Sequence, residues 1–176
     1  MFMKEFRAAI RDIPDFPKKG IVFKDITPLL QSGRLFQKVI DEMAERCRGK
    51  KIDCVAAIES RGFIFGAALA YKLGVGFIPV RKKGKLPYET VSVTYSLEYG
   101  EDTLEVHKDA FSPGAEVLVI DDLLATGGTL KAVCQLIEKL KAKVAHIICL
   151  VELSFLNGRS PLGRYSCECL VAFDGE

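Results

Sequence analysis

Short apolar runs are the most regular feature of the chain. Four of them, residues 52–58, 76–80, 116–120 and 145–151, contain few polar side chains. Runs of this length and composition are typical of strands that are buried on both faces of a sheet. We therefore predict four buried strands.

Segments with helical character separate these runs. Apolar side chains recur at helical spacing after Ser32 and again after Thr129, and residues 63–73 are rich in alanine and end at Gly74, a residue type suited to the position just past a helix. A further short helix is predicted over residues 4–11, before the first two prolines. The two predicted apolar stripes are Leu35, Val39, Ile40, Met43 and Cys47, and Leu130, Val133, Cys134, Ile137 and Leu140.

Strands that alternate with helices predict an α/β fold, in which a mostly parallel sheet carries helices on both faces. Residues 91–97 alternate between apolar and polar types, and residues 103–107 are suited to pair with them across a turn. We expect this pair to form an antiparallel flap beside the sheet. No repeat or linker-like segment interrupts the chain, so residues 1–176 are expected to form a single domain.

Composition excludes several functional classes. The chain has 25 Lys and Arg against 23 Asp and Glu, a net charge of +2, which gives no reason to expect a nucleic-acid or acidic membrane partner. No apolar run approaches the ~18 residues of a membrane-spanning helix. The N-terminal segment mixes both charge signs and lacks the apolar core of a signal peptide. We therefore expect a cytoplasmic protein.

The six cysteines fit a reducing compartment, because they are scattered through segments that otherwise have the composition of core strands and helices. Cys167 and Cys169 have the spacing of two residues on one face of a strand. No CxxC pair or histidine cluster accompanies them, and zinc needs three or four ligands, so no metal site is expected there.

The segment from residue 116 to residue 133 carries the clearest chemistry. A buried strand leads into Asp121 and Asp122, then two leucines, then the small-residue loop 125–129 (ATGGT), and then a helix. Ligands of open α/β sheets bind beyond the carboxyl ends of the strands, where this loop is expected. Its glycines let backbone N–H groups approach an anion, and its hydroxyls and the helix N-terminus add to the attraction. The loop is therefore predicted to bind phosphate.

The two acids need a different role, because they would repel a phosphate. Carboxylates accept hydrogen bonds from vicinal sugar hydroxyls, so the acidic pair and the loop together suit a ribose 5-phosphate. The alternative is an ordinary strand-to-helix turn, in which the helix dipole favours acids and Gly-Gly supplies the turn. The loop has neither the GxxxxGK nor the GxGxxG pattern, which argues against an ATPase or a dehydrogenase.

The sequence VLVIDDLLATGGT (117–129) resembles the motif that binds 5-phosphoribosyl 1-pyrophosphate (PRPP) in the type I phosphoribosyltransferases. The segments FPKKGIVFKDITPLL, ESRGFIFG, RKKGKLPYET and YSLEYG resemble the adenine phosphoribosyltransferase family, in that family's order and spacing. The resemblance covers nearly the whole chain. It implies the type I phosphoribosyltransferase fold, with a purine-binding hood over residues 1–30 and a basic loop and flap over residues 81–107.

The resemblance also implies an activity. This is transfer of the 5-phosphoribosyl group from PRPP to adenine, giving AMP and pyrophosphate in purine salvage through an oxocarbenium-like transition state. Mg²⁺ is expected to bind through the substrate, without a direct protein ligand. Members of the family are usually homodimers, so a homodimer is expected here.

Residue roles follow from the same resemblance. Glu98 would be the general acid or base, oriented by Tyr99, while Asp121 and Asp122 would hold the ribose hydroxyls. Phe23 would stack on the purine. The remaining expected binding residues are Ala125, Thr126, Gly127, Gly128 and Thr129 for the 5-phosphate; Arg61, Arg81, Lys82 and Lys85 for pyrophosphate; and the backbone of Val22 and Lys24, with Leu153, for adenine.

Two other functions stay open on the sequence. A phosphoribosyltransferase for another base, such as xanthine or hypoxanthine–guanine, is disfavoured by the FKDITPLL and SLEYG segments. A non-catalytic sensor of PRPP or a nucleotide would need a nucleic-acid surface, for which the net charge and the length leave no evident room.

Overall fold

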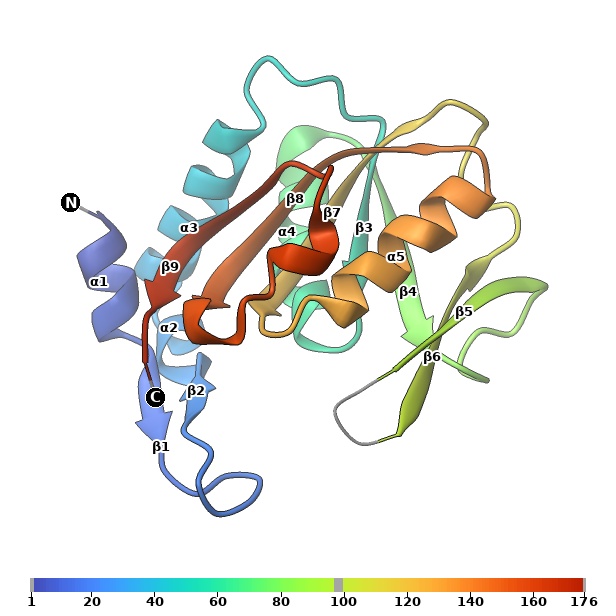
Figure 1. Ribbon diagram of the computed structural model, residues 1–176. Coiled ribbons are helices and arrows are strands. Elements are labelled where there is room, and N and C mark those ends of the chain that lie inside the picture. Colours follow the sequence, from blue (N-terminus) through green and yellow to red (C-terminus); the bar gives the residue numbers. More distant parts are fainter. Residues whose placement is uncertain (1, 97–99, 176) are drawn as a thin grey trace.

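A seven-stranded mixed sheet forms the centre of the molecule in the computed structural model, which describes residues 2–96 and 100–175 (Figure 1). The strands are β3 (Cys54–Ile58), β4 (Gly76–Lys82), β5 (Thr90–Ser96), β6 (Glu101–His107), β7 (Glu116–Leu124), β8 (Lys143–Leu153) and β9 (Cys167–Phe173). Their order across the sheet is β5-β6-β4-β3-β7-β8-β9. The five strands from β4 to β9 in this order run parallel, and β6 and β5 continue the sheet in antiparallel orientation.

Helices cover both faces of this sheet, as the sequence predicts (Figure 1). The helices are α1 (Phe2–Ala8), α2 (Thr27–Gln31), α3 (Gly33–Arg46), α4 (Arg61–Leu73) and α5 (Gly128–Lys139). In β7, Leu118 and Ile120 pack towards α1–α4, whereas Val117 and Val119 pack towards α5. All four side chains are fully buried. Because each face of the sheet is covered, the strands appear in the sequence as continuous apolar runs.

Local sequence signals set the helix ends. Helix α3 begins after Ser32, whose hydroxyl oxygen accepts a hydrogen bond from the Leu35 backbone N–H at 3.3 Å. Helix α4 ends at Gly74, which adopts the left-handed conformation with φ of +68°. Both helices therefore occur where their patterns predict them.

The N-terminal prediction is partly wrong. Helix α1 ends at Ala8 rather than at Arg11, because Arg11–Ile13 (β1) pairs with Phe23–Asp25 (β2) in a separate two-stranded antiparallel sheet. This pairing joins segments about ten residues apart, and helical periodicity contains no information about it.

Strand β7 is longer than predicted and includes the acidic pair. It pairs with β8 from Glu116 as far as Leu124, so Asp121 and Asp122 lie within the strand rather than after it. The predicted flap is also an integral part of the sheet, because β6 pairs with β4 through Arg81 and Lys82. Figure 1 shows the β5–β6 hairpin and the small β1–β2 sheet projecting on the side towards which the parallel strands point.

Within the described ranges no helix is long and apolar enough to cross a membrane. All six cysteines are free thiols.

Candidate active site

A cavity of about 620 Å³ opens at the carboxyl ends of the parallel strands. Its walls come from the ends of β3, β4 and β7, the loops after β3 and β7, strand β2 and the β5–β6 hairpin. The lining residues are Phe23, Ile58, Glu59, Ser60, Arg61, Lys82, Tyr95, Asp102, Leu104, Asp121, Asp122, Leu123, Ala125, Thr126, Gly127, Thr129 and Leu130. This location agrees with the rule for open α/β sheets.

The predicted phosphate loop forms one wall of the cavity. Gly127 precedes α5 with φ of +81°, and Gly128 is the first residue of that helix. A Cβ atom on Gly127 would lie 2.1 Å from the carbonyl oxygen of Gly158, so only glycine fits there. The loop therefore presents backbone N–H groups at a helix N-terminus, which is an arrangement that attracts anions.

A second segment supports this loop from behind. A Cβ atom on Gly158 would lie 2.0 Å from the carbonyl oxygen of Ala125. The neighbouring Arg159 binds Glu152 through two hydrogen bonds of 2.7 Å each and donates another of 2.7 Å to the Cys167 carbonyl. The sequence predicts only a loop here. The one local sign of its supporting role is a glycine followed by an arginine shortly after a buried strand.

The acidic pair lies beside Arg61, with Asp122 buried and Asp121 half-buried at the cavity wall. Arg61 Nε lies 2.8 Å from Asp122 Oδ2, and the Asp122 backbone N–H donates to Asp121 Oδ1 at 2.9 Å. Burial raises the pKa of Asp121 well above its usual range, and the charge of Asp122 adds to this effect. Burial also raises the pKa of Asp122, although the Arg61 guanidinium opposes the rise. A ligand that brings hydroxyl donors or positive charge to this pair would relieve the cost of ionising it.

Two of the expected pyrophosphate residues lie outside the cavity lining. Arg81 Nε and Lys85 Nζ each lie 2.7 Å from a carboxylate oxygen of Glu59, whose side chain is 6% exposed. Burial alone would raise the pKa of Glu59, but the hydrogen bonds from Lys85 and Arg81 outweigh it and hold the pKa below its usual range. Glu59 therefore anchors the basic loop.

Lys82, by contrast, lines the cavity. Its Nζ lies 3.0 Å from Asp102 Oδ2, and this hydrogen bond raises the pKa of Lys82. Together with Arg61, Lys82 gives the cavity two cationic side chains, each paired with a carboxylate.

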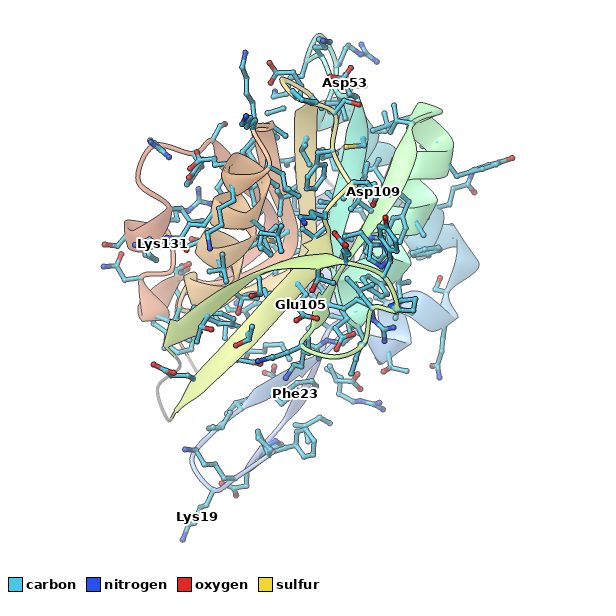
Figure 2. All side chains as sticks on the ribbon, turned by 90° about the vertical axis from the view of Figure 1, so that its right-hand side faces the viewer. Lys19, Phe23, Asp53, Glu105, Asp109 and Lys131 are labelled. Carbon is cyan, nitrogen blue, oxygen red and sulfur yellow. The ribbon has the colours of Figure 1, made fainter. Side chains whose placement is uncertain are left out.

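Phe23 is one of two aromatic residues in the described part of the chain that line the cavity, the other being Tyr95. It lies at the end of the two-stranded sheet that is nearest the large sheet (Figure 2). Its ring contacts Phe16 edge-on at a centroid distance of 5.2 Å, and the Arg61 guanidinium lies 5.0 Å from its centroid. Phe23 is therefore fixed by its neighbours while part of its surface stays open to the cavity.

The other expected adenine residues do not line the cavity. The Lys24 side chain is buried, with Nζ 2.8 Å from Asp12 Oδ1, so only its backbone remains a candidate. Val22 is half-buried, and Leu153 packs against the core on the α1–α4 side of the sheet.

Glu98 and Tyr99 lie outside the described residues. The sequence missed four polar lining residues, Glu59, Ser60, Tyr95 and Asp102. Glu59 and Ser60 directly follow β3, so their position at the carboxyl end of a predicted strand could have identified them as site residues. Tyr95 and Asp102 are direct partners across the β5–β6 hairpin, and only the strand register brings them together.

Comparison with known proteins assigns the family. Residues 27–164 match the family model described as a phosphoribosyl transferase domain. An adenine phosphoribosyltransferase from Roseiflexus castenholzii is 59% identical over 164 residues, which cover 93% of this chain and 95% of the relative. The chain belongs to the adenine phosphoribosyltransferase family.

Solved adenine phosphoribosyltransferases share the whole fold. The enzyme from Thermoanaerobacter pseudethanolicus superposes with a TM-score of 0.95 at 55% identity, covering 97% of this chain and 99% of that one. The Saccharomyces cerevisiae enzyme gives a TM-score of 0.91 at 43% identity, covering 96% and 98%. Since the coverage is nearly complete, the predicted type I phosphoribosyltransferase fold is confirmed.

Proposed function

We propose that this protein transfers the 5-phosphoribosyl group from PRPP to adenine, forming AMP and pyrophosphate in purine salvage. The observation that carries the proposal is that the phosphate loop, the acidic pair and Phe23 line one cavity of about 620 Å³. The yeast relative, at 43% identity, has been crystallised with adenine and an imino-altritol bisphosphate. A cavity with an anion-binding end and an aromatic face suits the same two ligands.

The loop residues Ala125 to Thr129 would hold the 5-phosphate, and Asp121 and Asp122 would accept hydrogen bonds from the ribose hydroxyls. As the bond from C1 to pyrophosphate breaks and the bond to purine N9 forms, positive charge develops on the ribose ring. The acidic pair would stabilise that charge, and such stabilisation is strongest in a site with little solvent screening. Positioning and electrostatics therefore supply most of the catalysis that this reaction requires.

Arg61 and Lys82 would bind the leaving pyrophosphate, because both line the cavity. Arg81 and Lys85 remain candidates that would have to exchange Glu59 for phosphate oxygens. Guanidinium groups bind phosphate oxygens in bidentate fashion, which favours Arg61 as the main contact.

Adenine would stack on Phe23, with the backbone of Val22 and Lys24 reading N1 and the N6 amino group. Hypoxanthine and guanine present the opposite donor and acceptor at these positions, and a mismatched buried pair is costly. Glu98 would take the proton that leaves N9 or stabilise N7, and Tyr99 would orient it. Leu153 would affect adenine binding only indirectly, because it packs against the core and does not line the cavity.

Mg²⁺ would enter with PRPP and balance the charge of the departing pyrophosphate. In the described parts of the chain, no three His, Cys, Asp or Glu side chains are grouped to hold a metal ion. We assign the ion to the substrate, because Mg²⁺ usually keeps several waters and binds through substrate phosphates.

We further propose that residues 1–176 act as one domain, with the hood and flap limits given above, and that the protein is a cytoplasmic homodimer. Its six free thiols are compatible with a reducing compartment. Sedimentation equilibrium at micromolar concentration tests the dimer, and a monomeric mass would contradict it.

A base panel tests the reaction. The protein is incubated with PRPP, Mg²⁺ and one of adenine, hypoxanthine, guanine, xanthine or orotate, and the nucleoside monophosphates are separated by chromatography. We expect AMP from adenine and no product from the other bases. Product from another base would contradict the assignment of Val22–Lys24. Binding of PRPP without any product would favour the non-catalytic sensor.

A further inference from the structure

Tyr95 lies on β5, outside the loop that is proposed to bind the 5-phosphate, yet its side chain reaches that loop. It lines the cavity together with Thr126, Gly127 and Thr129. The Thr129 hydroxyl donates a hydrogen bond to the Tyr95 hydroxyl at 3.3 Å. Because a phenol can both accept and donate, Tyr95 keeps its own proton for another acceptor.

The state of this phenol suits an anionic ligand. Burial raises the pKa of Tyr95, so the hydroxyl is protonated and neutral near pH 7. A neutral donor approaches a phosphate dianion without charge repulsion. Such a hydrogen bond to a charged group is stronger than one between neutral groups.

The hairpin that carries Tyr95 is held by contacts with β4, across the cavity from the phosphate loop. Asp102, the direct cross-strand partner of Tyr95, lies 3.0 Å from Lys82 Nζ on β4 and accepts a 2.8 Å hydrogen bond from the Thr103 backbone N–H. The Thr94 and Thr103 hydroxyls also share a hydrogen bond of 2.9 Å across the hairpin. Tyr95 is therefore presented to the phosphate loop from a strand whose position is fixed.

We propose that Tyr95 is a binding residue for the 5-phosphate and donates its hydroxyl proton to a phosphate oxygen beside Thr129. The ligand class is a pentose phosphate monoester, as in PRPP and AMP. The inference rests on the proposed placement of the 5-phosphate on loop 125–129. It adds a contact from the flap hairpin to a site otherwise formed by one strand-to-helix loop.

The test is the Tyr95→Phe variant, which removes only the hydroxyl. Titration calorimetry of the full chain measures Kd for AMP and, with Mg²⁺, for pyrophosphate. We expect the Kd for AMP to rise about tenfold or more, as for loss of a hydrogen bond to a charged group. The Kd for pyrophosphate should stay within about twofold, because its subsite lies elsewhere in the cavity. The matched control is Tyr165→Phe, which removes a phenol that donates to Glu138 at 3.0 Å and does not line the cavity.

Two results would overturn the inference. An unchanged Kd for AMP would show that the hydroxyl does not bind phosphate, and equal weakening of AMP and pyrophosphate would show that Tyr95 only supports the hairpin. A Gly127→Ala variant separates this inference from the proposed function, because its Cβ atom would lie 2.1 Å from the Gly158 carbonyl oxygen and would displace the backbone N–H groups of the loop. If it weakens AMP binding while Tyr95→Phe does not, only the inference fails. If it leaves AMP binding unchanged, the placement of the 5-phosphate fails, and the inference fails with it.

Discussion

When it is ionised, the carboxyl group of Asp121 lowers the stability of the folded protein, and substrate binding would offset this loss. Its pKa is raised by burial and by the charge of Asp122. Between the ordinary pKa near 4 and the raised one, the folded state binds more protons than the unfolded chain, so this group makes stability fall as pH rises. Asp121→Asn removes the ionisation. We expect it to raise Tm at pH 7.5 by about 2–4 °C, for a gain on the order of 1 kcal/mol, and to reduce turnover.

Asp25 supplies the control of opposite sign. Hydrogen bonds from Thr27, and then from Arg11, lower the pKa of Asp25 to about 2. Asp25→Asn should therefore lower Tm at neutral pH, and its difference from the unmodified protein should vanish as pH falls from 4 towards 2. Thermal melts of both variants between pH 3 and 8 check the two signs. A Tm for Asp121→Asn below that of the unmodified protein at pH 7.5 would contradict the argument.

Glu98 is the residue on which the proposed proton transfer depends. Glu98→Gln keeps the size of the side chain but removes its basicity, so we expect kcat to fall about 10²–10⁴-fold. The Kd for PRPP should change by less than about threefold, because the role belongs to the chemical step. Steady-state kinetics and PRPP titration check this, with Glu101→Gln as a control at an exposed residue three positions further along the chain. A kcat within a factor of two of the unmodified protein would show that Glu98 is not the acid or base.

At this scale, sequence reasoning found the residues that belong to contiguous motifs. Ala125, Thr126, Gly127, Thr129 and the acidic pair all line the cavity, and each lies in one strand–loop–helix segment. Tyr95 and Asp102 were not predictable in the same way, because their place depends on the register of two strands. The distribution of basic residues between the cavity and Glu59 also depends on tertiary contacts rather than on local sequence.

At the scale of elements, the phosphate loop depends on the segment that packs behind it. Gly158→Ala would place a Cβ atom 2.0 Å from the Ala125 carbonyl oxygen, so backbone must move. Overpacking of this kind costs about 1–3 kcal/mol, and here it displaces the loop. We expect AMP affinity to fall about tenfold, since phosphate contacts need positions accurate to well under 1 Å, while pyrophosphate affinity is retained.

Gly33→Ala is the matched control, because a Cβ atom at the start of α3 would meet nothing within 4 Å. Calorimetric titration with AMP and pyrophosphate, with circular dichroism to confirm folding, checks the prediction. A folded Gly158→Ala protein with unchanged AMP affinity would show that the loop does not rely on this support.

Element boundaries were less predictable than the elements themselves. The four buried strands and the helices after Ser32 and Thr129 occur as their patterns indicate. For strand β9 the sequence offered only the strand-like spacing of Cys167 and Cys169, and the extent of the strand at the edge of the sheet was not predicted. Strand β7 extends through the acidic pair because β8 continues beside it, and composition alone gives no sign of such pairing.

For the whole molecule, the alternation of strands and helices was sufficient to predict the α/β fold. The order of the strands was not, because β6 pairs with β4 and β9 pairs with β8 after long excursions of the chain. The cavity forms where these distant pieces meet: the two-stranded sheet, the ends of β3 and β7, and the β5–β6 hairpin. The sequence therefore predicts the separate parts of the site better than their assembly.

The response of the protein to metal removal depends on whether Mg²⁺ binds to the protein itself or only to its substrate. Mg²⁺ is proposed to belong to the PRPP complex rather than to the free protein, because it usually binds through substrate phosphates and keeps several waters. A ligand present at about a hundred times its Kd stabilises the native state by about 2.7 kcal/mol. For a chain of this size, that corresponds to a rise in Tm of roughly 5–10 °C.

We therefore expect EDTA to leave the Tm of the free protein unchanged and to reduce the Tm increase caused by PRPP. Differential scanning fluorimetry with Mg²⁺ or EDTA, with and without PRPP, checks both parts. AMP is the control ligand, because it carries the 5-phosphate without the pyrophosphate that would hold the ion, so its effect on Tm should not depend on EDTA. A lower Tm of the free protein in EDTA would contradict this and place a metal ion on the protein itself, because only an ion bound to the native state stabilises it.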